Sequence, residues 1–572
     1  KPMFSQMLGT NTVILLPQQG VLYGATGHVI MYTALYVLVG IPLLYMEYVI
    51  GQFTGRNCIE VWKARPFLSH VAYVQIFWQI MNVITNHTFA CFAVHYFLVS
   101  FESPIPYYQC GSWSYDNCNI LEYNYTIHQD CLSVNERLPY CTHLCTTFPE
   151  FQYWRYFTVG LNRNYFYLAW RVTLASAFIC IVCFFSCFKQ NKSLKKMLGL
   201  FVIFIIISRI LMLIGSMLQK GVVVKFDGAV DIDFTLFSQN VEVSKSLISM
   251  MSSLNLGTGI SFNLASTSSV RSPCYSNTVI AVVVTAGVTA AGICNFAMML
   301  CPYSFKYNIS PHVVAQYPMF IVYETIPRLL NVYEYKAFWL ILTYSMTAMS
   351  FFCVNIIIIA NLIDITSKKY PVVSSHPGIA SAAVMAALFV VTIPLLGNKS
   401  LLFISDVYRG INFFPIFTVV IECFVFMIAY GLERFSEDVH FMLGVQPNAF
   451  VKMSWVLSVF GCIFVFFYEI FNAYHSKRPS VGTHTGFWVM AIVMTTTVLV
   501  AVVQLLKALY QKRLREVISL DPSWGPRSQL LQRSRAMFTT HAMTKECIYR
   551  QYHLQSGIVA RQRTCNMRAP NL

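Results

Sequence analysis

The stretch 250-MMSSLNLGTGISFNLASTSS-269 decides the fold, because it places six Ser, two Thr, two Asn and two Gly inside a long apolar region. A helix that only crosses a membrane does not need these polar side chains. Unwound backbone survives at mid-membrane only where it is buried in protein or lines a cavity. The stretch therefore predicts a broken membrane helix whose carbonyls and hydroxyls form a binding site. A polar helix face packed by small residues is the alternative.

The composition excludes a soluble globular protein. Hydrophobic residues make up 56% of the 572 residues and charged residues only 11%, and the mean hydropathy is +0.56. A soluble domain carries about 25% charged residues, whereas about 20 apolar helical residues cross a bilayer. We expect twelve membrane spans, which lie near 1–22, 28–50, 71–101, 168–187, 194–219, 241–269, 277–301, 338–366, 377–397, 402–432, 451–473 and 485–511.

The first span, 7-MLGTNTVILLP-17, carries an interruption like that of the sixth. These two spans open two sets of five consecutive spans, 1–5 and 6–10. Paired interruptions at matching positions of two halves are typical of transporters built from inverted repeats. We therefore expect an all-α polytopic membrane protein with twelve transmembrane helices, two five-helix inverted repeats and breaks in spans one and six. The transporter domain covers 1–511.

Positive charge is concentrated in alternate loops and at the C-terminal end. Residues 507–572 hold twelve Lys and Arg against three Asp and Glu, within a net charge of +16. The positive-inside rule then places both termini in the cytoplasm, and we expect a multi-pass protein of the plasma membrane. Residues 512–572 form a basic cytoplasmic tail, which a solvated and partly disordered chain explains more simply than binding to anionic lipid.

The loop over 102–167 is extracellular in this topology, where disulfides persist. Its cysteines are odd in number, so at least one thiol is free or pairs elsewhere; they are Cys110, Cys118, Cys131, Cys141 and Cys145. Glycosylation sequons begin at Asn124, Asn308 and Asn398, all in loops predicted to face outward.

No enzyme motif is found in the sequence, neither a Gly-x-Ser-x-Gly elbow nor a His-Glu-x-x-His helix nor a phosphate-binding Gly-rich loop. Nothing resembles a repeated selectivity filter either. We expect no enzyme, no cofactor and no nucleic-acid partner. The expected partners are a small-molecule substrate and the lipid bilayer, and a second membrane protein or an oligomer stays open.

Three motifs resemble one family. The run 40-GIPLLYMEYVIGQF-53 resembles the second-span signature of the neurotransmitter:sodium symporter family, solute-carrier family six. The run 110-CGSWSYDNC-118 is similar to the family's paired-cysteine loop, and 421-IECFVFMIAYGLERFSEDVHFMLG-444 to its tenth span and following loop. The resemblance covers essentially the whole chain. It implies sodium-coupled import of an amino acid or related small amine by alternating access, with Na⁺ and Cl⁻ as candidate coupling ions, and a disulfide between the two cysteines of the 110–118 loop.

The resemblance implies a first sodium site that is weakened in this chain. Ser253 stands at the family's hydroxyl ligand, while Thr12 and Thr285 replace two Asn ligands. A hydroxyl is a shorter and poorer sodium ligand than an amide carbonyl. Met7 and Leu8 would add backbone oxygens.

The second sodium site departs further from the family. Cys353 and Val354 stand where the family has Asp-Ser, and a hard cation prefers oxygen ligands to a thiol or an isopropyl group. Backbone oxygens of Ser5, Leu8 and Ser350 are the remaining ligands. We expect weak sodium affinity there.

For chloride, the resemblance implies Tyr32 at the position of the coordinating tyrosine. Ser249 replaces a Gln and Thr289 a Ser, beside Ser253 and Thr285. No acidic residue stands in for the anion.

The resemblance also implies a substrate pocket, formed by Gly9, Asn86, Ser252, Asn255, Gly257 and Thr258. Gly9 occupies a position that is Gly in amino-acid carriers and Asp in amine carriers. Asn86 replaces a Tyr that touches the substrate carboxylate, and Asn255 replaces a Gly of the unwound turn. Asn255 could therefore fill the pocket itself.

At the outer gate, Leu15 replaces the family's Arg while Glu422 stands for its acidic partner. A lone carboxylate at that depth is protonated or finds another donor. Two hypotheses follow from these substitutions. One is a sodium-coupled carrier, and the other is a transport-deficient or sodium-independent relative that acts by binding or regulation.

Overall fold

The computed structural model describes most of the chain as helices. The residues described are 7, 12, 25–115, 118, 148–161, 169–188, 192–223, 240–307, 322–412, 414–475, 481–513, 517, 520–521 and 524–538. All structural statements below concern these residues.

Long apolar helices dominate the described chain. The second span is built from α3 (Ala25–Leu35), a π-helical turn (Tyr36–Gly40) and α4 (Ile41–Thr54). The later helices of the other unbroken spans are α5 (Val71–Val99), α8 (Trp170–Phe188), α9 (Lys192–Met217), α13 (Cys274–Tyr307), α16 (Lys336–Lys369), α18 (Pro377–Thr392), α19 (Asn398–Ile411) with α20 (Phe414–Cys423), α22 (Ala449–His475) and α23 (Val481–Tyr510). The remaining helices are α7 (Pro149–Gln152), α11 (Asn240–Leu254), α12 (Ile260–Ser266), α15 (Thr325–Leu330), α17 (Pro371–Ser375), α21 (Leu432–Leu443) and α25 (Gln529–Ala536).

The prediction of an all-α polytopic membrane protein is confirmed. Within the described residues, ten helical segments are long and apolar enough to cross a membrane. They correspond to ten of the twelve predicted spans. The sixth is divided between α11 and α12, each too short to cross alone, and the first lies almost wholly outside the described residues. The inverted repeat therefore stays a prediction.

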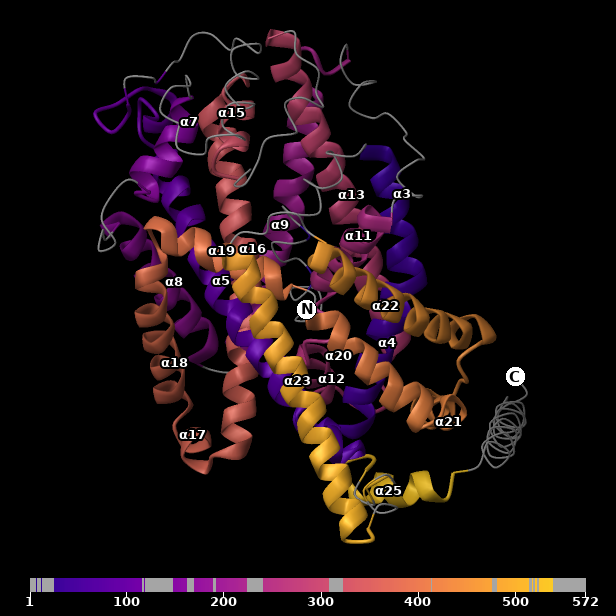
Figure 1. Cartoon of the computed structure of the whole chain (residues 1–572). Helices are drawn as coiled ribbons and strands as arrows, with labels where there is room; N and C mark the ends of the chain where they lie inside the picture. The colour runs from indigo at the N-terminus through magenta and orange to yellow at the C-terminus, as the bar shows by residue number, and fades with distance from the viewer. Residues whose placement is uncertain are drawn as a thin grey trace, which may run out of the picture.

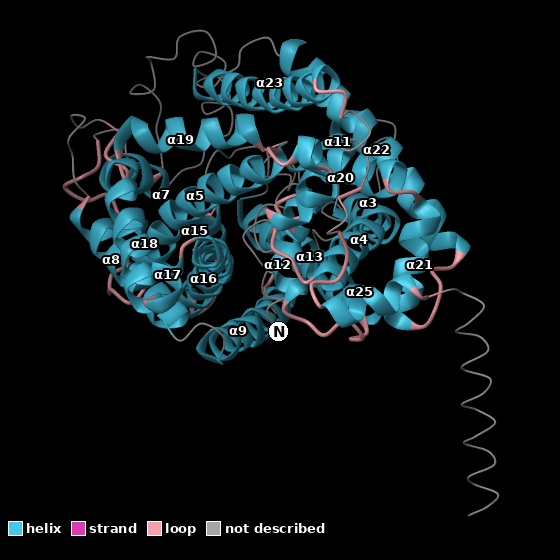
Figure 2. Cartoon of the chain, turned by 90° about the horizontal axis from the view of Figure 1, so that it is seen from below, coloured by secondary structure: helices cyan, strands magenta, loops and turns pink. Residues whose placement is uncertain are grey.

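The helices form two groups with the broken span between them. Seen from below, α5, α8, α16 and α18 gather on one side, and α4, α11, α13, α20 and α22 on the other, with α12 between the groups (Figure 2). Within the groups, α5 packs on α16 and α8, while α12 packs on α4.

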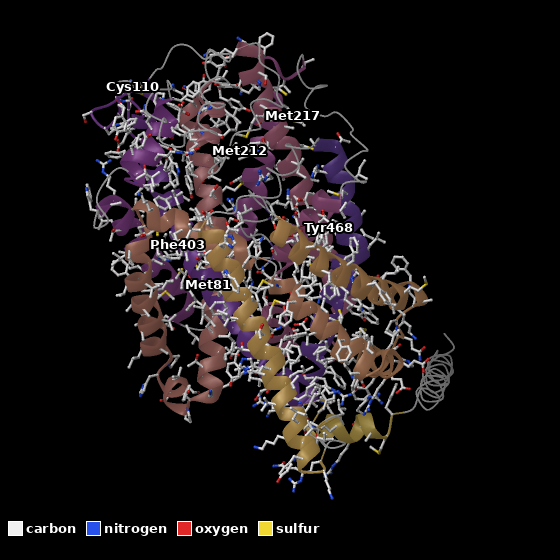
Figure 3. The ribbon with its side chains drawn as sticks, in the orientation of Figure 1. Met81, Cys110, Met212, Met217, Phe403 and Tyr468 are labelled. Atoms are coloured by element: carbon white, nitrogen blue, oxygen red, sulfur yellow. A yellow bond between two sulfur atoms is a disulfide. The ribbon has the colours of Figure 1, made fainter. Side chains whose placement is uncertain are left out.

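The two ends of the bundle carry different segments. At one end lie α7 and α15, and at the opposite end lie α17 and α25 (Figure 1). Cys110 lies at the same end as α7 (Figure 3), and it is bonded to Cys118 with an S–S distance of 2.07 Å. The predicted disulfide is thus confirmed.

The other predictions for the loops are not tested by the structure. Cys131, Cys141, Cys145, Asn124 and Asn308 lie outside the described residues. Asn398 begins α19, but its side chain is not described.

Part of the C-terminal tail is packed against the bundle, which differs from the solvated tail expected from its charge. Arg535 of α25 donates from Nε to Asp438 Oδ1 at 2.6 Å and from Nη2 to Glu437 Oε2 at 3.2 Å, both on α21. The Trp524 ring stacks on Phe426 with centroids 5.7 Å apart. Burial raises the pKa of the Asp438 carboxyl, although the guanidinium opposes the shift. The Trp524 ring and the Arg535–Asp438 ion pair hold residues 524–538 against the bundle. The basic composition of the tail gives no sign of these contacts.

We predict that Arg535→Ala loosens this segment. The substitution leaves the buried Asp438 without its cationic partner, which costs about 1–3 kcal/mol. Hydrogen–deuterium exchange should become faster in a peptide covering 524–538. Arg533→Ala removes an exposed side chain from the same helix and serves as the matched control. Equal exchange in both variants and the parent chain would contradict this role for the ion pair.

Candidate functional site

The sixth span is broken over residues 255–259. Helix α11 ends at Leu254 and α12 begins at Ile260. Between them, Asn255, Gly257 and Gly259 have φ angles of 53°, 70° and 77°. Glycine adopts positive φ without a Cβ clash, and Asn tolerates it better than most other residues. The predicted non-helical turn is confirmed. Its expected counterpart at 9–12 lies outside the described residues except for Thr12.

Side chains from three other spans hold the backbone of the turn. The N–H of Gly257 donates to Glu47 Oε1 at 2.7 Å. The carbonyl of Gly257 accepts from Thr418 Oγ1 at 2.7 Å and from Gln75 Nε2 at 3.2 Å. The carbonyl of Thr258 accepts from Gln79 Nε2 at 2.7 Å. An unpaired backbone group inside a membrane costs several kcal/mol, so these bonds are what allows the break.

Glu422 does not form the outer gate that we expected opposite Leu15. Its Oε1 accepts from Gln75 Nε2 at 2.6 Å, and Gln75 also bonds Gly257. Gln75 lies near the start of α5, the end of that helix away from the disulfide loop. The buried carboxylate has found a new donor, as expected for an acid without its Arg, but the donor lies beneath the turn. Leu15 is outside the described residues.

Three hydroxyl groups meet beside the end of α11. Tyr36 OH lies 2.8 Å from Ser253 Oγ and 3.4 Å from Thr289 Oγ1, and Ser253 also donates to Met250 O at 2.7 Å. Thr285 lies one turn before Thr289 on α13 and bonds the carbonyl of Ala281. Ser253 and Thr289 are therefore brought together as expected.

Tyr36 is the residue that sequence reasoning missed in this cluster. Tyr32, which we expected there, is buried one turn earlier on the same side of the second span. A π-helical turn starts at Tyr36 and alters the residue spacing between Tyr32 and the signature at Gly40. Tyr36 lies one helical turn after Tyr32, so i, i+4 spacing could have pointed to it. The role that the resemblance implies for Tyr32 stays a prediction.

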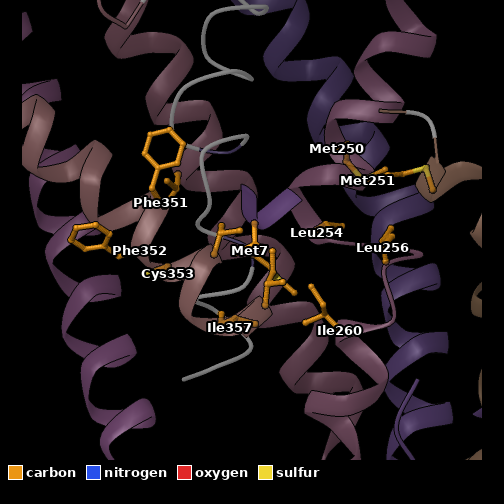
Figure 4. Packing of buried hydrophobic residues seen from close by; sticks show 14 of the residues in the cluster. Met7, Met250, Met251, Leu254, Leu256, Ile260, Phe351, Phe352, Cys353 and Ile357 are labelled. Carbon is orange, nitrogen blue, oxygen red and sulfur yellow. The ribbon is translucent and has the colours of Figure 1, made fainter. Parts of the chain in front are cut away.

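The second sodium position is surrounded by apolar groups. Cys353 and Ser350 are fully buried in α16, and Val354 is nearly so. Figure 4 shows Met7 between Cys353 on one side and Leu254 on the other. Neither the thiol of Cys353 nor the isopropyl group of Val354 offers an oxygen ligand, and the carbonyl of Met7 already accepts from Thr12 Oγ1 at 2.5 Å. Ser5 and Leu8 lie outside the described residues. We retain the prediction of a weak site.

Two expected pocket residues lie in different surroundings. Ser252, in the last turn of α11, has a buried hydroxyl without a hydrogen-bond partner among the described residues. Asn86 is half-buried on α5 and donates to Asn82, which also accepts from Tyr408 OH at 3.3 Å. Gly9 is outside the described residues, so the pocket that the resemblance implies stays a prediction. Ser249 is half-buried one turn before Ser253.

We predict that Gly257→Ala destabilises the protein. A Cβ at this position would lie 2.4 Å from Pro415 O and 2.5 Å from Thr418 Oγ1, and the positive φ disfavours any side chain. The expected loss is at least about 1–3 kcal/mol, seen as a lower midpoint of thermal unfolding in detergent. Gly287→Ala on α13 is the control, because no atom lies within 4 Å of its Cβ position. An unchanged midpoint for Gly257→Ala would contradict this picture of the turn.

Comparison with known proteins places the chain in a family of membrane transporters. The family model described as the Sodium:neurotransmitter symporter family matches residues 6–511. The sodium- and chloride-dependent glycine transporter 2 of Xenopus laevis is 20% identical over 571 residues, an alignment that covers 92% of this chain and 70% of that protein. The family match includes the turn at 255–259 and every span that holds it. The chain therefore belongs to the sodium:neurotransmitter symporter family and is a transporter rather than an enzyme.

Proposed function

We propose that this protein imports an amino acid or related small amine across the plasma membrane, coupled to Na⁺, with both termini in the cytoplasm. The observation that carries the proposal is the turn at 255–259, where the sixth membrane helix is broken beside the hydroxyl of Ser252, which has no hydrogen-bond partner in the part of the chain that the structure describes. Broken spans of this kind bind substrate near the bilayer midplane in transporters that work by alternating access.

A small amino acid is the substrate class that we favour. The relative from Xenopus laevis is named a glycine transporter. The resemblance gives Gly9, without a side chain, at the position where amine carriers have an Asp, so a substrate carboxylate can enter. The hydroxyl of Ser252 and the carbonyl of Asn255 are polar groups at the end of α11 that suit a zwitterion. Asn255 O already accepts from Thr258 Oγ1 at 2.7 Å.

The coupling ions belong at the hydroxyl cluster. Ser253 and Thr285, with backbone oxygens of the first span, would hold Na⁺. Tyr36, Ser253 and Thr289 would turn their hydroxyl hydrogens to Cl⁻. Ser253 and Thr289 would then give up their bonds to the carbonyls of Met250 and Thr285. An anion is held by donors alone in such a site, which agrees with the absence of an acidic residue in this cluster. Coupling through the second sodium position is weak in this proposal.

The direct experiment is uptake of a labelled amino-acid panel by the full chain in proteoliposomes. We expect uptake of a small amino acid with an inward Na⁺ gradient and its loss when N-methylglucamine replaces Na⁺. Uptake that is equal in both buffers would overturn sodium coupling. Specific substrate binding without any uptake would favour a transport-deficient binding protein.

We predict that Ser253→Ala reduces sodium-dependent uptake more than Cys353→Ala does. Ser253 lies in the hydroxyl cluster, whereas Cys353 is enclosed by apolar side chains. Loss of one oxygen ligand is worth about 1–3 kcal/mol, or about five- to a hundredfold in apparent sodium affinity. The sodium concentration for half-maximal uptake is the measurement. Equal or reversed effects would place the coupling site at α16 instead.

We predict that Asn255→Gly raises substrate affinity. Asn255 stands where the family has a Gly, and its φ of 53° is one that glycine adopts without strain. Removal of the side chain enlarges the space beside the turn. Scintillation proximity binding of labelled glycine measures the effect. An unchanged affinity would assign the main deficit to the weakened sodium sites and reject Asn255 as a plug.

A further inference from the structure

Two glutamines on the third span bind the turn. Gln75 and Gln79 lie one helical turn apart on α5 and are fully buried, so their side chains share one helix face. Gln75 Nε2 donates to Gly257 O at 3.2 Å, and Gln79 Nε2 donates to Thr258 O at 2.7 Å. Each therefore satisfies a carbonyl that the break in the sixth span releases.

Both amides are oriented by other donors. Trp62 Nε1 donates to Gln75 Oε1 at 3.3 Å, and Asn361 Nδ2 donates to Gln79 Oε1 at 2.6 Å. With the oxygens occupied, the amide nitrogens point to the turn. Burying an amide is costly unless its polar atoms are paired, and here the nitrogen and the oxygen of each amide have partners. These contacts fix the orientation of both side chains.

The two bonds to the turn cross between the helix groups. Helix α5 belongs with α16 and α8, whereas α12 packs on α4 (Figure 2). Any displacement of the turn relative to α5 must break the bonds from Gln75 and Gln79 together. The two carbonyls would be left in different states: Gly257 O keeps its bond from Thr418, while among the described residues the Thr258 carbonyl accepts from Gln79.

We propose that Gln75 and Gln79 form a clamp between the third span and the turn, and that they act as positioning residues for the transport cycle. The clamp limits the rate at which the turn moves away from α5 and opens the space beneath it. The inference rests on the proposed function, because alternating access requires one group of helices to rock against the other.

Cys58 reports on this movement. Its side chain is fully buried, and its Cβ lies 2.7 Å from the place that a Cβ on Gly259 would occupy. Burial raises the pKa of the Cys58 thiol to about 12. Only the thiolate reacts readily with maleimides, so modification requires the turn to move and admit solvent.

The test measures N-ethylmaleimide labelling of the full chain in proteoliposomes, with the peptide carrying Cys58 quantified by mass spectrometry. Gln75→Leu and Gln79→Leu should each label about three- to tenfold faster than the parent chain, as expected for the loss of one hydrogen bond to the turn. Gln75→Leu also removes the donor to Glu422, so Gln79→Leu is the cleaner of the two variants. Asn361→Leu keeps Gln79 but removes its orienting donor, and it should give a smaller increase. Thr85→Val is the matched control, because Thr85 is buried on α5 and bonds only its own helix at Met81 O in the contacts seen here.

Parent-like labelling rates in both glutamine variants would overturn the clamp. An equal increase in Thr85→Val would overturn it too, since general loosening of α5 would then explain the result. If Gln75→Leu or Gln79→Leu fails to elute as a folded monodisperse species, the labelling rate of Asn361→Leu is compared with that of the parent chain instead. A parent-like rate in Asn361→Leu would then overturn the clamp. Labelling needs no substrate, so expected labelling without amino-acid uptake contradicts the proposed function and leaves the clamp supported.

Discussion

The structure depends on pairing the backbone groups that a break in a membrane helix sets free. Water cannot satisfy these groups in the hydrocarbon region, so the protein must supply partners from its own side chains. At Gly257 the partners come from Glu47 for the N–H and from Thr418 and Gln75 for the carbonyl. Helices α4, α5 and α20 are therefore tied to one residue. The break is both the candidate binding site and the point where three spans converge.

This constraint explains why acidic and amide side chains lie within an apolar bundle. Glu47 belongs to the signature of the second span, and its carboxylate accepts from the N–H of Gly257 in the turn. Glu422 and Gln75 lie beneath it and bond each other at 2.6 Å. Intramembrane ionisable residues are costly and mark functional regions. Here they stabilise the irregular backbone of the candidate binding site.

The parts of this site that depend on local backbone could be predicted from the sequence. Glycines at 257 and 259 within a polar interruption indicated the break, because few other residues adopt positive φ. The placement of Glu422 was wrong because the position of an acid along a span does not reveal the helix it faces. The roles of Gln75 and Gln79 were missed for the same reason, since their partners lie about 180 positions away in the chain. Long-range side-chain donors have no local signal.

The most direct measurement is an experimental structure of the full chain in lipid nanodiscs, determined by electron cryomicroscopy in sodium buffer at a resolution that shows carbonyl groups. The account predicts that helical hydrogen bonding stops at Leu254 and resumes at Ile260, with Gly257 O within hydrogen-bonding distance of Thr418 and Gln75. Continuous i to i−4 hydrogen bonding through residues 250–262 would contradict it, because the released carbonyls and the site between them would not exist.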